Sequence, residues 1–351
     1  MTELSTPDSQ HLWRLARKPG KGGPTDGDFN WTEESIPDPG ANQLCSRTIY
    51  LSMDPYQWVR RRTGTEQPGD VCHGRTVSQV VKSNHSDYDE GDYLFNTNGW
   101  SEFGLTGDGI DYFNYMLPRK LDATAAPLST AIGVLGMLGL TAYAGSVVQC
   151  DPQPGETFVV SAASGGVGQV AGQLARIRGC RVVGIAGVDE KCQYVVNELG
   201  FDACVSHLSE TLGDDLKCAC PDGIDVYFEN VGGKVFDAVA PLLNTKSRVS
   251  VCGLISQYGL ADPGVSRQSW NETGQSHFDR HDVTVHDLFV GNFVKDYQAK
   301  FLEEASSWYR DGKLKYREDF WDGLERAPKA LNAMLTGHNF GKMIVRVSEV
   351  P

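Results

Sequence analysis

The stretch FVVSAASGGVGQVAGQLARIRGCRVVGIAG, residues 158–187, organises the interpretation of the whole chain. It opens with the β-branched and aromatic residues typical of a buried strand, and small residues follow that let the backbone come close to another molecule. Apolar residues at helical spacing then lead to a helix stop at Gly179, and a second apolar strand is predicted from Arg181 to Ala186. Strand, glycine-rich turn, helix and strand within about 30 residues are typical of the βαβ unit that holds a dinucleotide pyrophosphate at a helix N-terminus.

The turn reads AxxGxxG, with Ala162 at the place of the first glycine of the usual fingerprint. This pattern by itself is weak, because glycines also serve tight turns and close helix–strand packing. Its position between a strand and a helix favours a cofactor site over plain packing. The residues of the turn expected to contact the cofactor are Ala163, Ser164, Gly165, Gly166, Val167 and Gly168.

The end of the second strand indicates which dinucleotide is bound. An NAD site usually carries an acidic residue there, which holds the ribose 2′-hydroxyl. Here the strand ends at Ala186 and Gly187, and Asp189 already belongs to the start of the next helix. A small strand end followed by the cation of Lys191 suits a 2′-phosphate, so the sequence favours NADPH/NADP. Spacing alone leaves open the alternative that Lys191 is a solvated surface lysine.

Composition limits the classes of function. A chain of 351 residues, 40% hydrophobic and 22% charged, is long enough for two domains with separate cores. The net charge of -13 argues against nucleic acid or an anionic membrane surface as a partner. Nine scattered cysteines do not resemble a disulfide framework, and the polar start MTELSTPDSQHLW lacks the apolar core of a signal peptide. We therefore expect a reduced, cytoplasmic enzyme.

The segment at 131–148 has no charged residue and reaches the length threshold of a membrane span. It contains Gly133, Gly136, Gly139 and Gly145, and it has no basic flank. A buried helix at a domain junction explains this composition better than a membrane helix.

The remaining patterns predict two kinds of domain. Residues 1–130 contain short strand-like runs at 43–51, 76–82 and 92–95, separated by turn residues, which indicates a β-rich domain. After the βαβ unit, strands are expected at 203–205, 224–228 and 248–252, and helices at 191–199 and 236–243. Strands and helices that alternate in this way predict a doubly wound parallel sheet.

The last part of the chain is less regular. The polar residues of 259–283 predict a mobile loop, and the run 285–290 a last strand of the sheet. An amphipathic helix is expected at 297–309 and a final strand at 339–347.

Several long motifs in order along the chain resemble one family, the zinc-independent medium-chain dehydrogenase/reductases. The resemblance is to the branch of the prostaglandin reductases, plant double-bond reductases and bacterial curcumin reductase. The motifs are LSMDPY at 51–56, GVLGM at 133–137, GLTAY at 139–143, AASGGVG at 162–168, GCRVVGIAG at 179–187, EKC at 190–192, YFENVGG at 227–233, CGLISQY at 252–258, KYRED at 315–319, DGLERAP at 322–328 and NFGK at 339–342.

The resemblance implies an α/β fold with two domains. Residues 1–130 and 297–351, the two ends of the chain, would form a GroES-like, β-rich catalytic domain. Residues 131–296 would form a Rossmann domain, a doubly wound parallel sheet that binds NADP. It also implies a small-molecule enone or enal substrate and a homodimer.

The expected absence of a metal depends on the ligands. Zinc alcohol dehydrogenases place a carboxylate directly after a glycine and a histidine, whereas here Cys72-His73 is followed by Gly74-Arg75. Cys218 and Cys220 have no second pair at zinc spacing. Structural cysteines explain both places better, so we predict no metal.

Reduction of a conjugated alkene needs no metal. Hydride added at the β-carbon moves charge onto the carbonyl oxygen, where the protein needs a hydrogen-bond donor and then a proton for the α-carbon. The resemblance places Tyr258 close to the nicotinamide and Tyr56 at the substrate mouth, as catalytic residues. Without it, each tyrosine would be interpreted as a packed aromatic with a satisfied hydroxyl. Water or a ribose hydroxyl remains an alternative proton source.

Cofactor contacts follow from the resemblance residue by residue. Lys191 corresponds to the lysine that holds the 2′-phosphate, Asn230 to the residue of the ENVGG turn near the ribose, and Asn339 to a C-terminal phosphate contact. His207 stands where many members have a tyrosine near the 2′-phosphate. Further cofactor contacts are expected from Gly187, Cys252, Gly253 and Leu288.

The chain departs from the family pattern mainly on the substrate side. Gln57 and Trp58 follow the DPY motif, Gly259 follows the SQY motif, and Asp287-Leu288 replaces a Gly-Phe. These changes bear on substrate identity more than on cofactor or reaction. We therefore predict an NADPH-dependent enone or 2-alkenal reductase. The alternatives are a quinone reductase on the same fold and a non-catalytic NADPH-binding protein.

Overall fold

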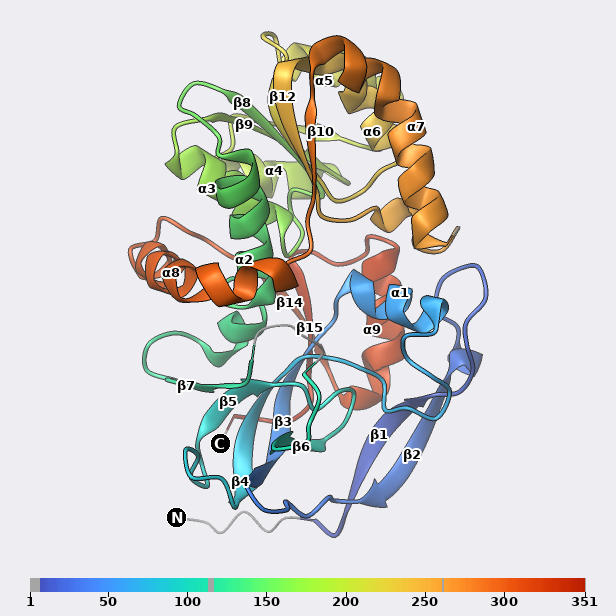
Figure 1. Cartoon of the computed structure of the whole chain (residues 1–351), viewed down its shortest axis with the longest axis vertical. Helices are drawn as coiled ribbons and strands as arrows, with labels where there is room; N and C mark the ends of the chain where they lie inside the picture. The colour runs from blue at the N-terminus through green and yellow to red at the C-terminus, as the bar shows by residue number, and fades with distance from the viewer. Residues whose placement is uncertain (1–6, 113–116, 261, 351) are drawn as a thin grey trace. The chain divides into compact units, whose positions relative to one another are not determined.

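The computed structural model describes residues 7–112, 117–260 and 262–350. It divides into two compact units (Figure 1). Unit 1 comprises Met1–Gly133, Asp319–His338 and Met343–Pro351, and unit 2 comprises Val134–Glu318 and Asn339–Lys342. The expected boundary at 130/131 lies three residues before the division between Gly133 and Val134. The expected boundary at 296/297 lies inside α8 (Gly291–Arg310), which belongs to unit 2.

Unit 2 contains a parallel sheet of six strands. In spatial order the strands are β10 (Ala203–Ser206), β9 (Arg181–Ala186), β8 (Thr157–Ser161), β11 (Ile224–Glu229), β12 (Leu243–Val251) and β13 (Thr284–Asp287). Neighbouring strands pair in parallel, and the first strand of the unit, β8, lies next to β11 in the middle. This order makes the gap between β8 and β11 a topological switch point, where doubly wound sheets bind ligands. The predicted Rossmann sheet is confirmed.

Helices lie on both sides of this sheet, with α3 on one side and α6 and α7 on the other (Figure 1). Besides α8, the α-helices of unit 2 are α2 (Met137–Tyr143), α3 (Gly168–Ile177), α4 (Asp189–Asn197), α5 (Leu212–Ala219), α6 (Lys234–Val239) and α7 (Pro263–His281). Beneath α5, α6 and α7 lies a core of buried apolar side chains that includes Leu216, Phe236 and Val249. The predicted βαβ unit is present, with its second strand at Arg181–Ala186 as expected.

The prediction of a mobile loop over 259–283 is wrong for the part that forms α7; Ala261 lies outside the described residues. The helix has almost no apolar periodicity, so its sequence gave little sign of it. Two aromatic residues eight positions apart, Trp270 and Phe278, anchor it on Phe236. Packing of these rings, and not a continuous apolar face, holds the helix on the sheet.

The uncharged segment at 131–148 folds as several short helical pieces. After a 3-10 turn at Leu128–Ile132 come α2 and a π-helical turn at Ala144–Cys150. A side chain at Gly139 would collide with the carbonyl of Val134. The glycines therefore allow close packing of buried backbone. No helix in the described residues is long and apolar enough to cross a membrane.

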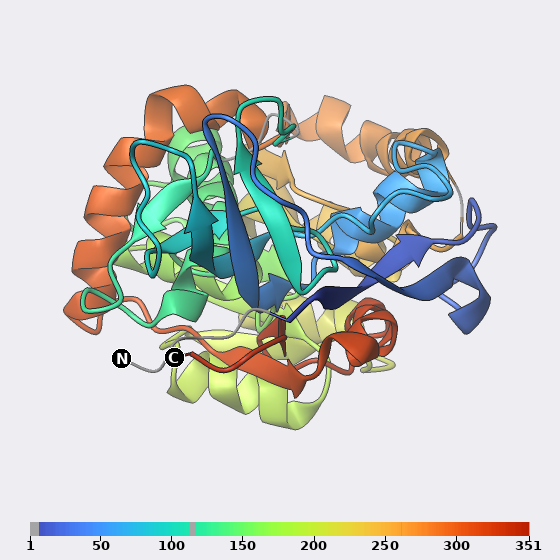
Figure 2. The same ribbon diagram turned by 90° about the horizontal axis from the view of Figure 1, so that it is seen from below.

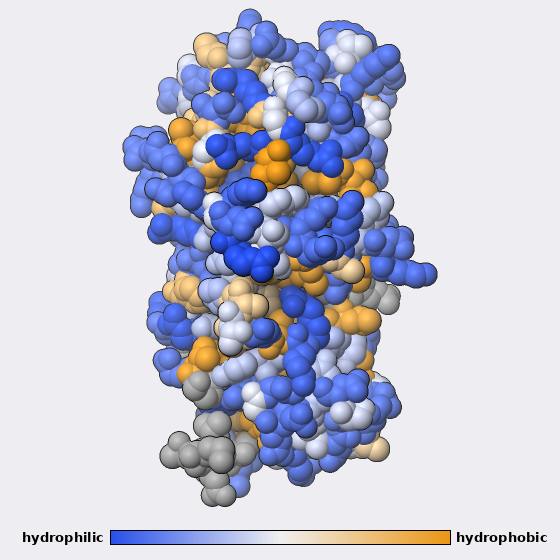
Figure 3. All heavy atoms as spheres, turned by 90° about the vertical axis from the view of Figure 1, so that its left-hand side faces the viewer, coloured by the Kyte–Doolittle hydropathy of each residue, from blue (hydrophilic) through white to orange (hydrophobic). Residues whose placement is uncertain are grey.

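Helix α8 (Gly291–Arg310) is amphipathic, as predicted for 297–309, and begins six residues earlier. Its buried side includes Phe301 and Ala305. Figure 3 shows the face on which α8 lies as mainly hydrophilic, with apolar side chains in small groups between polar ones. The side of α8 away from the core is thus a solvated surface.

Unit 1 is built on a sheet of seven strands (Figure 2). The order is β14 (Glu318–Asp322), β15 (Lys342–Arg346), β3 (Gln43–Ser52), β4 (Thr76–Ser83), β5 (Tyr93–Asn96) and β7 (Arg119–Leu121), with β6 (Phe103–Gly107) paired to β3. A separate ribbon joins β1 (Ser9–Leu15) to β2 (Phe29–Ser35). Because β15 pairs with β3, the end of the chain completes a sheet begun near its start.

Two helices of unit 1 were not predicted from the sequence. These are α1 (Pro55–Thr63) and α9 (Ala327–Leu335), which contact each other. Trp58 of α1 and Leu331 of α9 belong to the same buried cluster, and the indole of Trp58 donates to the carbonyl of Gly22. The departure at Trp58 is therefore a core residue of unit 1.

Candidate functional site

The glycine-rich turn joins β8 to the N-terminus of α3. Ala162, at the place of the first fingerprint glycine, has a φ of 50°, a left-handed conformation that glycine adopts more readily. Its carbonyl accepts the amide of Gly165 at 2.8 Å, and a side chain at Gly168 would collide with that same carbonyl. The turn thus keeps the tight geometry of a pyrophosphate-binding loop although an alanine begins it.

Two side chains that were not predicted approach this turn. A Cβ atom at Gly166 would lie 3.3 Å from the side chain of Lys342 and 3.5 Å from the hydroxyl of Tyr316. Asn339, a predicted phosphate contact, precedes β15, and its amide donates to the carbonyl of Gly341 at 2.7 Å. The short return of the chain at residues 339–342 therefore brings Lys342 beside the glycine-rich turn of unit 2.

The end of β9 is surrounded by basic side chains. A Cβ atom at Gly187 would lie 3.5 Å from His207 Nε2 and 3.9 Å from Lys191 Cδ, so both predicted side chains converge there. Burial and the charges of Lys234 and Lys191 lower the pKa of His207. The imidazole is therefore a neutral hydrogen-bonding group at pH 7, and the lysines supply the positive charge. Lys234, the first residue of α6, was not among the predicted contacts.

The ENVGG turn after β11 is fixed by a buried carboxylate. Glu229 Oε1 accepts hydrogen bonds from the Tyr227 hydroxyl at 2.8 Å, the Ser161 hydroxyl at 3.0 Å and the amides of Val231 and Gly232 at 2.7 and 3.0 Å. Its other oxygen accepts the indole N–H of Trp270 at 3.0 Å. Five donors therefore hold one fully buried side chain at the switch point of the sheet.

Asn230 is fixed by the same arrangement. Its amide nitrogen donates to the carbonyl of Ser161 at 2.7 Å, and its backbone N–H donates to the Ser161 hydroxyl at 2.8 Å. Ser161 thus ties this predicted ribose contact to the end of β8. The hydrogen bond to the Ser161 carbonyl thus fixes the orientation of the Asn230 side chain.

Replacing Glu229 with glutamine is expected to destabilise the protein by about 1–3 kcal/mol, because an NH₂ group would then face donors in a buried site. Thermal unfolding monitored by circular dichroism measures the loss. Tyr227→Phe removes one of the five donors and leaves the carboxylate, so it serves as the control with the smaller effect. Equal shifts of Tm for the two variants would contradict this account.

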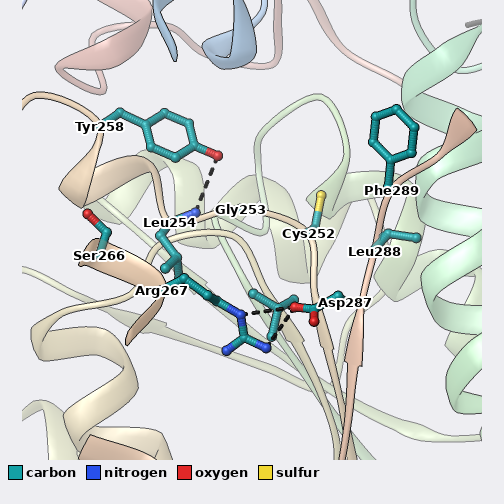
Figure 4. Close-up of a pocket in the computed structure, with 10 residues that line it drawn as sticks. Cys252, Gly253, Leu254, Tyr258, Ser266, Arg267, Asp287, Leu288 and Phe289 are labelled. Atoms are coloured by element: carbon teal, nitrogen blue, oxygen red, sulfur yellow. Dashed lines mark hydrogen bonds and ion pairs between the residues drawn. The ribbon is translucent and has the colours of Figure 1, made fainter. Parts of the chain in front are cut away.

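A cavity of about 220 Å³ opens at the carboxyl ends of β12 and β13 (Figure 4). It brings together four predicted residues, Cys252, Gly253, Tyr258 and Leu288. The Tyr258 hydroxyl lies above Gly253, where a Cβ atom would be 2.6 Å from its oxygen, and it accepts the amide of Leu254 at 3.4 Å. Gly253 therefore leaves room for this hydroxyl.

Tyr258 is held as a neutral phenol. Burial first, and then the neighbouring Cys252, raise the pKa of its hydroxyl. A phenol with a raised pKa remains protonated at neutral pH, so it can donate a hydrogen bond but cannot act as a base.

The far wall of the cavity carries an ion pair. Arg267 Nη2 lies 2.7 Å from Asp287 Oδ1, and its guanidinium lies over the ring of Trp270. Asp287, one of the departures from the family pattern, is thus paired with a residue of α7. The sequence did not indicate this pair, because the segment of Arg267 was expected to be a loop.

Tyr56 belongs to unit 1, whereas the other predicted site residues belong to unit 2. It is the second residue of α1, and its hydroxyl lies 2.9 Å from Nε2 of the buried His73. Burial, followed by the charges of Arg75, Arg60 and Arg61, lowers the pKa of His73. Tyr56 is thus hydrogen-bonded to a neutral imidazole.

Comparisons with known proteins place the chain in a family. Residues 11–112 match the sequence model described as the N-terminal domain of oxidoreductase, and residues 166–307 match that of the zinc-binding dehydrogenases. The NADPH-dependent curcumin reductase of Escherichia coli (strain K12) is 40% identical over 346 residues, which cover 96% of each protein. The chain belongs to the zinc-independent branch of the medium-chain dehydrogenase/reductases.

Other members of the family agree over nearly the full length. Mouse prostaglandin reductase 1 is 36% identical over 95% of this chain and 98% of its own. The crystal structure of CurA from Vibrio vulnificus in complex with NADPH superposes with a TM-score of 0.88 and 38% identity, over 97% of this chain and 100% of the other. The resemblance in the sequence motifs is thus confirmed.

The matching family is described as zinc-binding, but the possible zinc ligands of this chain lie in an unsuitable environment. Cys72 is fully buried next to His73. The positive charges of Arg75, Arg60 and Arg61 act on the adjacent His73 and disfavour a further cation there. Glu66, the carboxylate that acts on Cys72, is paired with Arg61 at 2.9 Å. Within residues 7–112, 117–260 and 262–350, no three His, Cys, Asp or Glu side chains gather where they could hold a metal. These donors do not fit zinc.

Proposed function

We propose that this chain reduces the carbon–carbon double bond of α,β-unsaturated ketones or aldehydes with NADPH. The observation that carries the proposal is the neutral hydroxyl of Tyr258 above Gly253, in the same unit as the basic side chains around Gly187. The names of the relatives support it: besides the curcumin and prostaglandin reductases, tobacco 2-alkenal reductase is 39% identical over 88% of this chain.

The residues of unit 2 suit NADPH at both of its ends. Lys191 and Lys234 provide charge for the 2′-phosphate, and His207 provides a neutral hydrogen-bonding group beside them. The turn from Ala163 to Gly168 offers a helix N-terminus to the pyrophosphate. We assign to the nicotinamide the cavity that Cys252, Gly253 and Leu288 line together with Tyr258.

The chemistry follows from the donor that the site offers. When bound, NADPH supplies a hydride to the β-carbon of the conjugated alkene. The electron pair of the alkene then moves to the carbonyl oxygen, and Tyr258 donates a hydrogen bond or a proton as negative charge develops. Protonation of the α-carbon completes the saturated product. A conjugated alkene is the proposed substrate, because its reduction does not require a metal to polarise an isolated carbonyl.

Tyr56 is proposed to orient the substrate carbonyl, and its hydroxyl lies 2.9 Å from Nε2 of His73. The proposed partner is a small-molecule enone or enal. The expected homodimer and the cytoplasmic location remain predictions.

The test is NADPH oxidation by the purified protein with an enone panel, a quinone, a saturated ketone and no acceptor. We expect oxidation with the enones, a product that gains two hydrogen atoms at the alkene, and an unchanged rate in the presence of a strong chelator. Turnover of the quinone alone would support the quinone reductase instead. Bound NADPH without any turnover would indicate a non-catalytic protein.

A further inference from the structure

Two of the nine cysteines lie in contact beside the basic side chains of unit 2. The sulfur atoms of Cys192 and Cys204 are 2.7 Å apart, and both residues are half-buried. Cys192 lies in the first turn of α4, and Cys204 lies on β10, the edge strand that pairs with β9. The two cysteines are twelve positions apart along the chain, so the folding of α4 onto β10 creates this pair.

The pair differs chemically from most other thiols of the chain. Burial raises the pKa values of Cys45, Cys72, Cys150, Cys180, Cys220 and Cys252 to about 11 or 12. In contrast, a hydrogen bond from Cys204 lowers the pKa of Cys192. A thiolate is the reactive form of cysteine, and a partly exposed thiolate next to a second thiol is typical of oxidant-sensitive sites.

We propose that Cys192 and Cys204 form a redox-active pair, which a peroxide converts to a disulfide and a small thiol reduces again. The Cys192 thiolate attacks one peroxide oxygen, the O–O bond breaks, and a sulfenic acid and water form. The Cys204 thiol then attacks the sulfenic sulfur and displaces a second water. The two sulfurs lose two electrons, the peroxide gains two, and both thiol protons leave in water.

The second step is favoured by the first. The pKa of the Cys204 thiol is raised chiefly by the hydrogen bond to Cys192, together with burial and the charge of Cys192. A sulfenic acid at Cys192 is uncharged, so the negative charge of Cys192 no longer raises the pKa of the Cys204 thiol. The sulfur atoms are already close, and a disulfide needs them at about 2.05 Å, which requires only a small movement of α4 toward β10.

Both cysteines are close in sequence to residues of the proposed cofactor site. Cys192 directly follows Lys191, and Cys204 lies three residues before His207, so each cysteine is close in sequence to a side chain at Gly187. If the chain binds NADPH as proposed, a bound 2′-phosphate places negative charge near Cys192 and disfavours its thiolate. Oxidation should therefore be slower with NADP⁺ than with NAD⁺ at equal occupancy.

The experiment treats the reduced full-length protein, without cofactor, with an equimolar amount of hydrogen peroxide, followed by alkylation and peptide mapping. We expect a cross-linked Cys192–Cys204 peptide two hydrogen atoms lighter than the free peptides, formed roughly tenfold faster than Cys218 is consumed, and reversed by dithiothreitol. Cys218, which is exposed on α5, is the matched control: Cys218→Ser retains the cross-link, whereas Cys192→Ser abolishes it.

Two outcomes would overturn the proposal. One is oxidation of Cys192 to a sulfinic acid without a cross-link, and the other is consumption of Cys218 while the pair stays reduced. Both are read from the wild-type protein, so neither depends on the folding of a variant. Equal oxidation rates with NADP⁺ and NAD⁺ would refute the link to the 2′-phosphate. A failure of NADPH binding would be seen separately, because the cross-link is measured without cofactor.

Discussion

Replacing Tyr258 with phenylalanine is expected to lower kcat by roughly 10- to 1,000-fold while the affinity for NADPH stays nearly constant. The carbonyl oxygen carries more negative charge in the transition state than in the bound enone, so a donor aimed at it lowers the barrier more than it tightens binding. The phenylalanine ring keeps the packing over Gly253 and removes only the hydroxyl. Steady-state kinetics on an enone, together with NADPH titration, measure both effects.

The pH dependence gives a second measurement of the same residue. Because burial raises the pKa of Tyr258, its proton is retained as the pH rises through about 10, the ordinary value for tyrosine. The kcat of the wild-type protein should therefore not fall in that range through loss of this proton.

One outcome would contradict the proposed role of Tyr258. An unchanged kcat in Tyr258→Phe would assign the proton to water or to a ribose hydroxyl.

Tyr56→Phe is the matched comparison, since it also removes one phenol hydroxyl from a proposed carbonyl donor. If Tyr56 orients the substrate carbonyl equally in the ground and transition states, its loss raises KM and leaves kcat nearly unchanged. The opposite pattern, a large loss of kcat for Tyr56 and none for Tyr258, would exchange the two roles.

Replacing Lys191 with alanine is expected to weaken the binding of NADPH about 10- to 150-fold and that of NADH very little. Only NADPH has a 2′-phosphate, and a charge-assisted contact of this kind contributes about 1.5–3 kcal/mol. Lys234, whose charge also acts on His207, is expected to supply the remaining positive charge, so that the variant keeps some preference for NADPH. Fluorescence titration with both cofactors measures the ratio of the two dissociation constants.

The control for charge alone is Lys217→Ala, because Lys217 is an exposed lysine in the last turn of α5. It should change neither dissociation constant. Equal losses of NADPH and NADH binding in Lys191→Ala would make Lys191 a surface residue, the alternative that spacing alone left open.

Much of the fold could be predicted because its signals are local. The strand at Arg181–Ala186 and the helix after the glycine-rich turn each have a regular pattern of apolar residues. Helix α7 could not be predicted in this way. Its stability depends on Trp270 and Phe278 meeting Phe236, a residue more than 30 positions earlier in the chain.

The sequence by itself determined the parallel sheet, the glycine-rich turn, the lysine after β9 and the family, because these depend on neighbouring residues or on motifs in order. Only the tertiary structure decided which side chains meet. Arg267 pairs with Asp287, the Tyr258 hydroxyl lies over Gly253, and the pair Cys192–Cys204 comes into contact. The physical reason is the pairing of parallel strands, which brings the ends of distant segments to one edge of the sheet, where no periodicity of the sequence records the contact.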